Sequence, residues 1–182
     1  PRTADPSDAG AVGEWIGGLA KEAGAGRGAP IVVAASRREV ALRRLSIDLP
    51  LDSDGDARSF SKDELPGLVR VNLLKQLTMP IEQSVVDFVI TRSEDGVPRE
   101  ALAAIASASR VDHWREIMRA AGLKLRGIVP RGVGVARLAR GDDGLSALIV
   151  APGPRATEIV VVESGRLSTT REAEIGLDDD AL

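Results

Sequence analysis

The sequence predicts a mixed α/β fold, and the arrangement of its apolar residues indicates it. Short apolar runs bounded by Gly, Pro or Ser recur along the chain, as expected of buried strands. Between them lie stretches with apolar residues three and four positions apart, as expected of amphipathic helices. The 182 residues include no cysteine, so disulfides and thiolate metal sites are excluded and packing alone must supply the core.

The opening of the chain predicts a helix followed by two strands. Residues 1–10 are rich in Pro, Gly, Asp and Ala without a period, and we expect them to be disordered. Residues 11–24 have helical spacing and end at Gly24. Residues 30–35 are apolar throughout, which indicates a strand buried on both faces, and 40–47 form a strand with one partly solvated face.

The next helix has two possible starting points. Ser61 begins a capping-box pattern, but a helix capped there would hold Pro66 beyond its first turn, where the missing N–H and the ring clash cost about 3 kcal/mol. With Asp63 as the N-cap, Pro66 falls in the first turn, where its N–H would have no partner anyway. We therefore predict a start after Asp63 and an end before Pro80. The apolar stripe of this helix is Leu65, Leu68, Val69, Leu73 and Leu77.

A strand at 85–92 is followed by an ambiguous run at 102–107. The many alanines of this run have helix propensity, whereas a hairpin partner for 85–92 would have to be a strand. The residues by themselves leave both possibilities open. A helix is then predicted over 111–121, with Gly122 as a left-handed cap and Leu123 packed back onto the helix.

The last part of the chain is predicted to be rich in strands. A short strand at 125–129 and a short helix at 133–138 lead to Gly141–Gly144, where we place a domain boundary. Three apolar strands follow in quick succession, two of them joined by a tight turn at Ser164-Gly165; they are 145–150, 157–163 and 166–171.

Composition excludes several classes of function. The net charge of −3 gives no electrostatic reason to expect nucleic acid as a partner, and two Trp and two Phe are too few for a base-stacking surface. No apolar run approaches the roughly 20 residues of a membrane span. The chain opens on Pro1 without a leader pattern and stops just after a strand-like stretch, so we expect it to be part of a longer protein.

Several sequence segments, in their order and spacing, resemble those of the PilM family of type IV pilus assembly proteins. The resemblance runs from about residue 11 to 176. Four segments show the resemblance. They are the strand pair 31–47 with Arg43-Arg44-Leu45 before Pro50, the segment from Glu64-Leu65-Pro66 to Phe88, the helix end at Ala120–Lys124, and Val150–Ile159 followed by Gly165-Arg166-Leu167.

The resemblance implies a fragment of the actin-like ATPase fold, which FtsA, Hsp70 and sugar kinases share. It also implies that 102–107 is a strand, within an inserted strand-helix-strand-strand subdomain at about 40–107. The core expected for this insert is Leu65, Leu68, Val69, Leu73, Val86, Phe88 and Ile105. The implied division is a disordered start and first-lobe helix at 1–28, the end of the first lobe at 29–141, and the opening strands of the second lobe at 145–182.

The resemblance also points to a candidate nucleotide site in the turn before 157–163. In the family, an Asp-x-Gly turn followed by a small hydroxyl residue brings backbone N–H groups to a phosphate, and the carboxylate organises a metal-bound water. Gly153 and Thr157 keep this pattern and are the candidate cofactor-binding residues. Ala151 replaces the carboxylate, and Pro152 and Pro154 remove two donors. An ordinary β-turn is therefore the favoured interpretation over a weakened nucleotide site.

Other candidates for chemistry are weaker. His113, the single histidine, has no cysteine to complete a zinc site. The acidic loop at 52–56 lacks the glutamate that a calcium loop needs. Arginine pairs at 37–38 and 43–44 could bind anions, but such pairs more often cover an exposed strand edge. We therefore expect no catalytic residues, no metal and no enzyme activity in this chain, with ATP only a possible ligand of the longer parent protein.

By resemblance, the function implied is that of a PilM-like cytoplasmic scaffold. Such proteins lie beneath the inner membrane and bind the cytoplasmic tail of a membrane partner, PilN, in a groove beside the inserted subdomain. The implied location is cytoplasmic and peripheral to the inner membrane, with no direct insertion. The alternatives are a catalytic ATPase or small-molecule kinase of the same fold, a GspL-type secretion protein, or an FtsA-like division scaffold.

Overall fold

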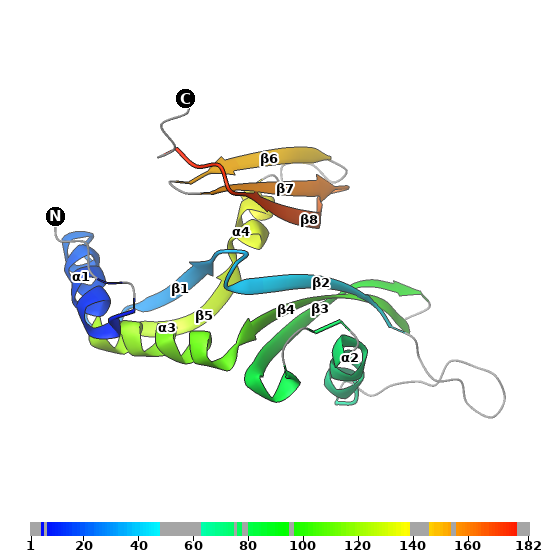
Figure 1. Cartoon of the computed structure of the whole chain (residues 1–182), viewed down its shortest axis with the longest axis horizontal. Helices are drawn as coiled ribbons and strands as arrows, with labels where there is room; N and C mark the ends of the chain where they lie inside the picture. Colours follow the sequence, from blue (N-terminus) through cyan, green and yellow to red (C-terminus); the bar gives the residue numbers. More distant parts are fainter. Residues whose placement is uncertain are drawn as a thin grey trace. The chain divides into compact units, whose positions relative to one another are not determined.

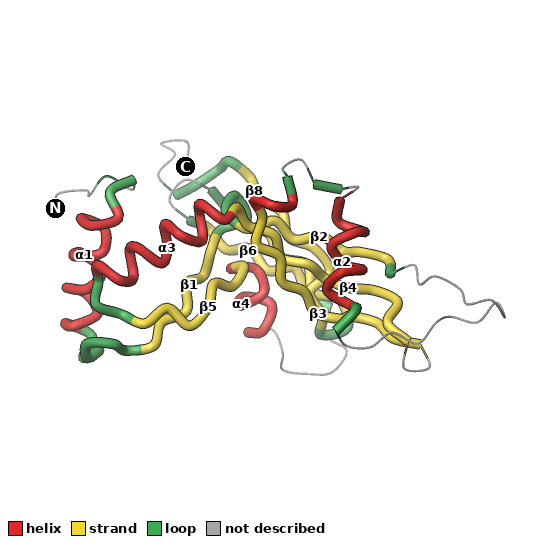
Figure 2. Tube along the Cα trace, turned by 90° about the horizontal axis from the view of Figure 1, so that it is seen from below, coloured by secondary structure: helices red, strands yellow, loops and turns green. Residues whose placement is uncertain are grey.

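The computed structural model divides into two compact units, which Figures 1 and 2 show in two views. Unit 1 contains Pro1–Val40 and Arg110–Leu182, and unit 2 contains Ala41–Ser109. The acidic loop at 52–56 and the boundary predicted at Gly141–Gly144 lie outside the described residues. The structure describes residue 5 and residues 7–47, 63–74, 76–77, 80–94, 97–138, 146–153 and 156–177.

Unit 1 begins with helices packed beside two parallel strands. In Figure 2, β1 and β5 run next to each other, and their register pairs Val33 with Ile128. Helices α1 and α3 form a buried cluster with these strands around Ile117 and Met118. The elements are α1 (Ala9–Glu22), β1 (Pro30–Ala35), α3 (Ala108–Ala120), β5 (Lys124–Pro130) and α4 (Arg131–Leu138).

Helix α1 begins at Ala9, two residues earlier than predicted. The carboxylate of Asp8 accepts a hydrogen bond from the backbone N–H of Ala11 at 3.0 Å and caps the helix. The prediction of disorder over 1–10 is therefore wrong for residues 7–10. The sequence around Asp8 consists mostly of Pro, Gly, Ser and Ala. It shows no hydrophobic periodicity, so the start of the helix could not be detected from the pattern.

Two glycines let α1 approach α3 closely. A Cβ placed on Gly13 would lie 2.5 Å from the Cβ of Ala120, and one on Gly17 would lie 2.9 Å from the carbonyl oxygen of Ala121. Both distances are far shorter than a van der Waals contact. The two glycines stand four residues apart, on one face of α1, so the crossing requires the absence of side chains at both.

Strand β1 is buried on one face and not on two, which corrects the prediction. Val33 is buried, but Val32 is 57% exposed. The helices of unit 1 cover the side of β1 that carries Val33. A fully apolar sequence could not reveal this, because it makes both faces of the strand look equally suited to burial.

The end of α3 confirms the predicted left-handed cap. Gly122 has φ of +69°, and the N–H of Leu123 donates to the carbonyl of Met118 at 2.9 Å. The N–H of Gly122 donates to the carbonyl of Arg119 at 3.1 Å. This pair of bonds satisfies the last carbonyls of the helix and turns Leu123 back into the core.

Three antiparallel strands complete unit 1, in the order β6-β7-β8, and α4 packs against them. Ser164 and Gly165 both have positive φ, 50° and 70°, as the predicted tight hairpin turn between β7 and β8 requires. Helix α4 starts at Arg131, two residues before its predicted start. The strands are β6 (Ala147–Pro152), β7 (Thr157–Glu163) and β8 (Arg166–Ala173).

Unit 2 is a three-stranded sheet in the order β2-β4-β3, with one helix packed on it. Residues 102–107 belong to β4, so the predicted strand is confirmed and the helix alternative is wrong. β3 and β4 form a long antiparallel hairpin in which Val86 pairs with Ile105. The elements are β2 (Val40–Ser46), α2 (Leu65–Leu74), the short 3₁₀ helix η1 (Ile81–Gln83), β3 (Ser84–Glu94) and β4 (Val97–Ser107).

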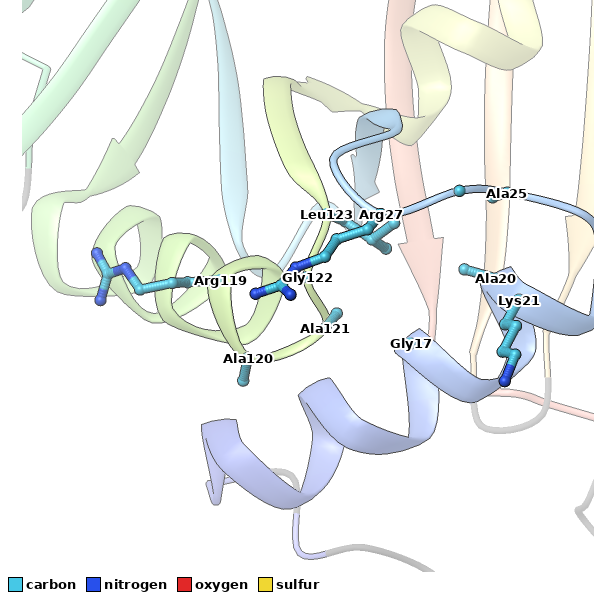
Figure 3. Close-up of a pocket in the computed structure, with 11 residues that line it drawn as sticks. Gly17, Ala20, Lys21, Ala25, Arg27, Arg119, Ala120, Ala121, Gly122 and Leu123 are labelled. Carbon is cyan, nitrogen blue, oxygen red and sulfur yellow. The ribbon is translucent and has the colours of Figure 1, made fainter.

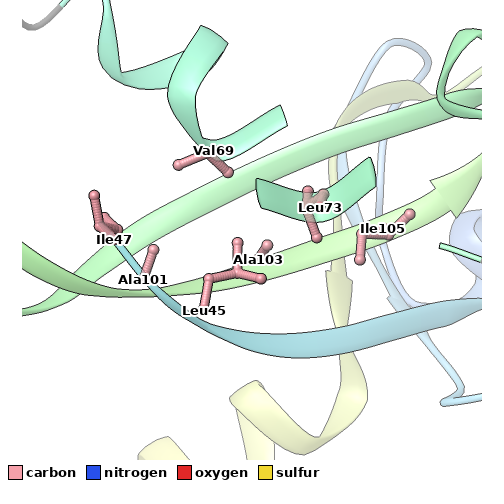
Figure 4. Close-up of a cluster of buried hydrophobic side chains, with 7 residues drawn as sticks. All are labelled: Leu45, Ile47, Val69, Leu73, Ala101, Ala103 and Ile105. Atoms are coloured by element: carbon pink, nitrogen blue, oxygen red, sulfur yellow. The ribbon is translucent and has the colours of Figure 1, made fainter. Parts of the chain in front are cut away.

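Helix α2 covers the core of unit 2 with two fully buried side chains, Val69 and Leu73 (Figure 4). Of the predicted core, all members except Leu65 belong to this cluster. Leu65 is the first helical residue, so Pro66 is the second, one position earlier than predicted. The buried members of the cluster are Leu45, Ile47, Val69, Leu73, Ala101, Ala103 and Ile105.

Candidate functional site

The candidate nucleotide-binding turn lies between β6 and β7, and the N–H of Gly153 and the hydroxyl of Thr157 are both hydrogen-bonded. The N–H of Gly153 donates to the carbonyl of Ala156 at 3.0 Å, which closes the turn. The hydroxyl of Thr157 donates to the carbonyl of Ile175 at 2.7 Å. The N–H of Leu177 donates to the carbonyl of Gly153 at 2.9 Å. The turn is thus held against the segment after β8. The N–H of Gly153 and the hydroxyl of Thr157 are therefore not directed at a phosphate site.

A carboxylate does stand beside the position of Ala151, but it comes from the neighbouring strand. Ala151 is directly opposite Glu158 in the register of β6 and β7, so the two side chains share a face of the sheet. Glu158 is only 1% exposed, and its Oε2 accepts a hydrogen bond from Nε of Arg131 at 2.6 Å. The charge of this carboxylate is therefore already balanced by an arginine.

Gly132, in the first turn of α4, lets the helix backbone lie close to Glu158. A Cβ on Gly132 would lie 2.8 Å from Oε1 of Glu158 and 2.5 Å from Cγ2 of Thr170. The first turn of α4 thus lies directly against the buried carboxylate. The positive end of a helix dipole favours a negative charge at this location, and Arg131 adds a full positive charge.

Sequence reasoning missed Glu158, although a signal was present. The run 157–163 alternates between the two faces of β7, and Glu158 occupies the same face as Val160 and Val162, which are almost completely buried. A charged residue at an inward position of an otherwise apolar strand requires a partner. That reasoning would have led to a search for a cation, and Arg131 is the first residue of the preceding helix.

A cavity of about 570 Å³ lies in unit 1 near the C-terminal ends of α1 and α3 (Figure 3). Small residues form much of its lining, and Lys21, Arg27 and Arg119 contribute the charge. Lys21 and Arg119 occupy the last turns of their helices, where cations stabilise the free carbonyls. In Figure 3 these two side chains point away from each other, so the three cations do not converge on one point.

One face of the unit 2 sheet is covered by α2, and the other face carries exposed apolar side chains. Val85 is 41% exposed and Val89 60% exposed, while the alternate residues Val86 and Phe88 pack beneath α2. Val89 pairs with Leu102 across β3 and β4, which places both on this second face. We call the surface formed by Val85, Val89 and Leu102 the open face.

Charged residues near the tip of the β3–β4 hairpin form an ion-pair network. Arg92 contacts Glu94 and also Glu100, the latter at 3.4 Å, and Arg44 of β2 lies 3.8 Å from Glu100. The carboxylate of Glu94, with a smaller contribution from Glu100, raises the pKa of Arg92 above its ordinary value. The network joins all three strands of the sheet at one end.

Solved structures with the same arrangement of elements identify the fold. No family model and no curated protein sequence matches the chain. A structure of the PilM-PilN type IV pilus biogenesis complex superposes with a TM-score of 0.76 at 23% identity, over 98% of this chain and 53% of the matched one. The chain has the fold of PilM. The predicted α/β fragment of the actin-like fold is confirmed.

A second structure to which the chain is similar comes from a type II secretion system. The cytoplasmic domain of EpsL, an inner-membrane component of the type II secretion system of Vibrio cholerae, matches with a TM-score of 0.61 at 10% identity. The match covers 91% of this chain and 56% of the EpsL chain. The chain therefore spans about half the length of both structures.

The weaker candidates from the sequence were His113 and the two arginine pairs. His113 is half-buried on α3. Among the described residues, no group of three or more His, Cys, Asp or Glu side chains could hold a metal ion. Within the same residues, none of the helices is both long and apolar enough to cross a membrane. Arg37 and Arg38 contact β8, and Nη1 of Arg43 donates to the carbonyl of Leu42, so neither pair is reserved for an anion.

Proposed function

We propose that this chain is part of a PilM-like cytoplasmic scaffold that binds the tail of an inner-membrane protein of a pilus or related secretion machine. The observation that carries the proposal is the open face of unit 2, on a chain with the fold of a protein whose structure was solved together with PilN. The protein would be peripheral to the inner membrane, and its partner would supply the attachment.

The open face has the properties of a peptide-binding surface. Val85 and Val89 are exposed on β3, which is an edge strand of the sheet. The exposed Asp87 lies between them on the same face, and Leu102 adds apolar surface beside Val89. Apolar side chains that gather on one exposed face mark an interaction surface when they form a contiguous patch. An edge strand also offers free backbone groups to an extended peptide, and alternate side chains can then provide specificity. An apolar tail segment is the partner that this surface suits.

The same proposal assigns no catalysis to the chain. Ala151 supplies no carboxylate, Glu158 is neutralised by Arg131, and the hydroxyl of Thr157 donates to Ile175. Among the described residues of this turn and its neighbouring strand, the groups considered for a phosphate or a metal-bound water are thus missing or already engaged. A nucleotide in the longer parent protein would thus find a degenerate site here, at Gly153 and Thr157.

Binding of tail peptides tests the proposal directly. The cytoplasmic tails of inner-membrane proteins encoded beside its gene are titrated into the protein by calorimetry. We expect one of them to bind, and Val89→Glu to weaken that binding at least tenfold. The matched control is Val71→Glu, because Val71 is 57% exposed in the same unit but lies on α2. Binding that both variants leave unchanged would exclude the open face, and binding of no tail would overturn the scaffold role.

A second candidate is a GspL-type role in type II secretion, which the similarity to the EpsL cytoplasmic domain favours. The tail assay distinguishes the two, because tails of pilus and secretion components are tested side by side. A catalytic ATPase or kinase is the remaining alternative. Turnover of ATP by the longer parent protein, with no tail bound, would favour that alternative.

A further inference from the structure

The cavity of unit 1 lies where two helices end next to each other. α1 ends at Glu22 and α3 at Ala120, and the close crossing of the helices at Gly17 brings these ends together. The loop after α1 adds Ala25 and Gly26 to the lining. Most lining residues are glycine or alanine, so backbone and methyl groups form the walls (Figure 3). The volume of about 570 Å³ is thus left open by the small size of these residues.

The charged residues of this lining all have one sign. They are Lys21, Arg27 and Arg119, which we call the cation group, and no Asp or Glu lines the cavity with them. Within the described part of the chain, none of the three takes part in an ion pair, whereas Arg38 and Arg131, for example, do. The whole chain has a net charge of −3, so the cation group is a local reversal of its overall charge.

The three cations are spread around the cavity and do not gather at one point. In Figure 3, Lys21 and Arg119 point away from each other, and Arg27 extends over the end of α3. A Cβ on Gly122, at that end, would lie 3.7 Å from Cγ of Arg27. Sites for a single phosphate or carboxylate direct several donors at the same oxygen atoms. Separated cations instead suit a ligand whose negative charges are themselves separated.

We propose that this cavity binds an acidic segment of a protein partner, whose carboxylates contact Lys21, Arg27 and Arg119 separately. The small walls leave room for the partner's side chains between those contacts. An anionic membrane surface suits the cavity less, because membrane-binding surfaces insert large apolar side chains, and Leu123, the large apolar residue of the lining, is buried. All of these residues belong to unit 1, so the inference is independent of what the open face of unit 2 binds.

The alternative explanation is that the cation group only stabilises the helix ends. Lys21 and Arg119 lie in the last turns of their helices, where a positive charge complements the free carbonyls. That role predicts a small loss of stability on substitution and no affinity for an acidic ligand. Arg137 separates the two explanations, because it is an exposed cation in the last turn of α4 but does not line the cavity.

The test titrates the 182-residue chain into a fluorescein-labelled peptide of alternating glutamate and alanine, and fluorescence anisotropy gives the affinity at low and at high salt. The variants are Lys21→Gln, Arg27→Gln and Arg119→Gln, with Arg137→Gln as the matched control. All three members of the cation group are exposed, so glutamine at these positions leaves the core intact. The other probes are inorganic phosphate, vesicles of phosphatidylglycerol, and a peptide of alternating lysine and alanine.

We expect the glutamate peptide to bind, the lysine peptide not to bind, and each variant of the cation group to weaken the affinity about fivefold, as the loss of one solvated charge pair allows. High salt should weaken binding, Arg137→Gln should not, and the amides of Gly26 and Gly122 should shift most in an NMR titration. The proposal is overturned if the glutamate peptide does not bind, or if Arg137→Gln weakens its binding as much as Arg119→Gln does. Tighter binding of phosphate or of the vesicles than of the peptide, lost in the same variants, would also overturn it.

Discussion

Glu158 and Arg131 form an ion pair across the boundary between β7 and α4, with Nε of Arg131 2.6 Å from Oε2 of Glu158. The two partners differ in exposure: 1% of the glutamate side chain is accessible and 37% of the arginine. The glutamate thus depends on the arginine, whereas the arginine retains part of its hydration. The pair fixes the start of α4 on the three-stranded sheet of unit 1.

Removal of the arginine should be costly. We expect Arg131→Ala to lower the free energy of unfolding by about 3 kcal/mol, because a buried carboxylate loses its partner. Urea denaturation followed by circular dichroism measures the change. Arg137→Ala, an exposed arginine of the same helix, is the control and should cost less than about 1 kcal/mol. Equal effects of the two substitutions would show that the pair does not stabilise the fold.

Two glycines of α4 should respond in opposite directions to alanine. Gly132→Ala places a methyl group 2.5 Å from Thr170 and 2.8 Å from Glu158, and we expect a loss of about 2 kcal/mol through overpacking. Gly134 has open space around it, so Gly134→Ala should stabilise the helix by up to about 1 kcal/mol. Thermal unfolding of the two variants, compared with that of the original chain, tests the sign of each change in stability. A stabilising Gly132→Ala would contradict the close contact.

The fold was largely predictable because local and tertiary preferences agree along most of the chain. The exception is β4, whose alanines favour a helix by propensity. Ala101 and Ala103 are completely buried beneath α2. Small residues here serve packing between the sheet and a helix, and propensity carries no information about such a contact. Only the resemblance to PilM-like sequences selected the strand.

The candidate site was less predictable, for a different reason. The missing carboxylate at Ala151 is visible from a single position of the sequence. The Glu158–Arg131 ion pair is not, because its prediction requires knowing which residues come into contact. The contacts of Arg38 with Glu172 likewise join residues more than a hundred positions apart in the sequence. Charge pairs of this kind are fixed by topology, and neither partner alone shows a pattern. Sequence periodicity finds elements and cores, but it does not find such pairs.

The indole of Trp114 should be replaceable by phenylalanine. Its Nε1 is buried and has no hydrogen-bond partner among the described residues, and an unsatisfied buried donor costs about 1–3 kcal/mol. Trp114→Phe removes that donor but also removes volume, so we expect a net change within about 1 kcal/mol, whereas Trp114→Ala should cost about 3–5 kcal/mol. Urea denaturation measured by circular dichroism compares the two. A loss of several kcal/mol for the phenylalanine variant would indicate that the indole N–H has a partner.

Restoring the carboxylate at position 151 should not restore a nucleotide site. Ala151→Asp would place a second carboxylate directly opposite the buried Glu158, and like charges in that position destabilise a strand pair by up to about 1 kcal/mol. We expect neither the original chain nor this variant to bind ATP with magnesium-dependent micromolar affinity in calorimetry. Such an affinity in the original chain would refute the degenerate site. Its appearance only in the variant would show that the missing carboxylate is the sole defect.

Two neighbouring leucines of α2 allow a sharp test of the core of unit 2. Leu73 is completely buried and Leu74 is 54% exposed, although they have the same chemistry and lie in the same turn. We expect Leu73→Ala to cost about 3 kcal/mol, since it leaves a cavity between α2 and β4. Leu74→Ala should change the stability by less than about 0.5 kcal/mol.

The measurement for this pair has to report on unit 2. Both tryptophans, Trp15 and Trp114, lie in unit 1, so fluorescence would follow the wrong unit. Amide exchange of the buried β4 residues Ala101, Ala103 and Ile105 reports directly on the core beneath α2. With Leu73→Ala these amides should exchange about a hundredfold faster, because about 3 kcal/mol corresponds to roughly two powers of ten in an opening equilibrium. Faster exchange of β4 in the Leu74→Ala variant as well would mean that α2 packs on the sheet by another face.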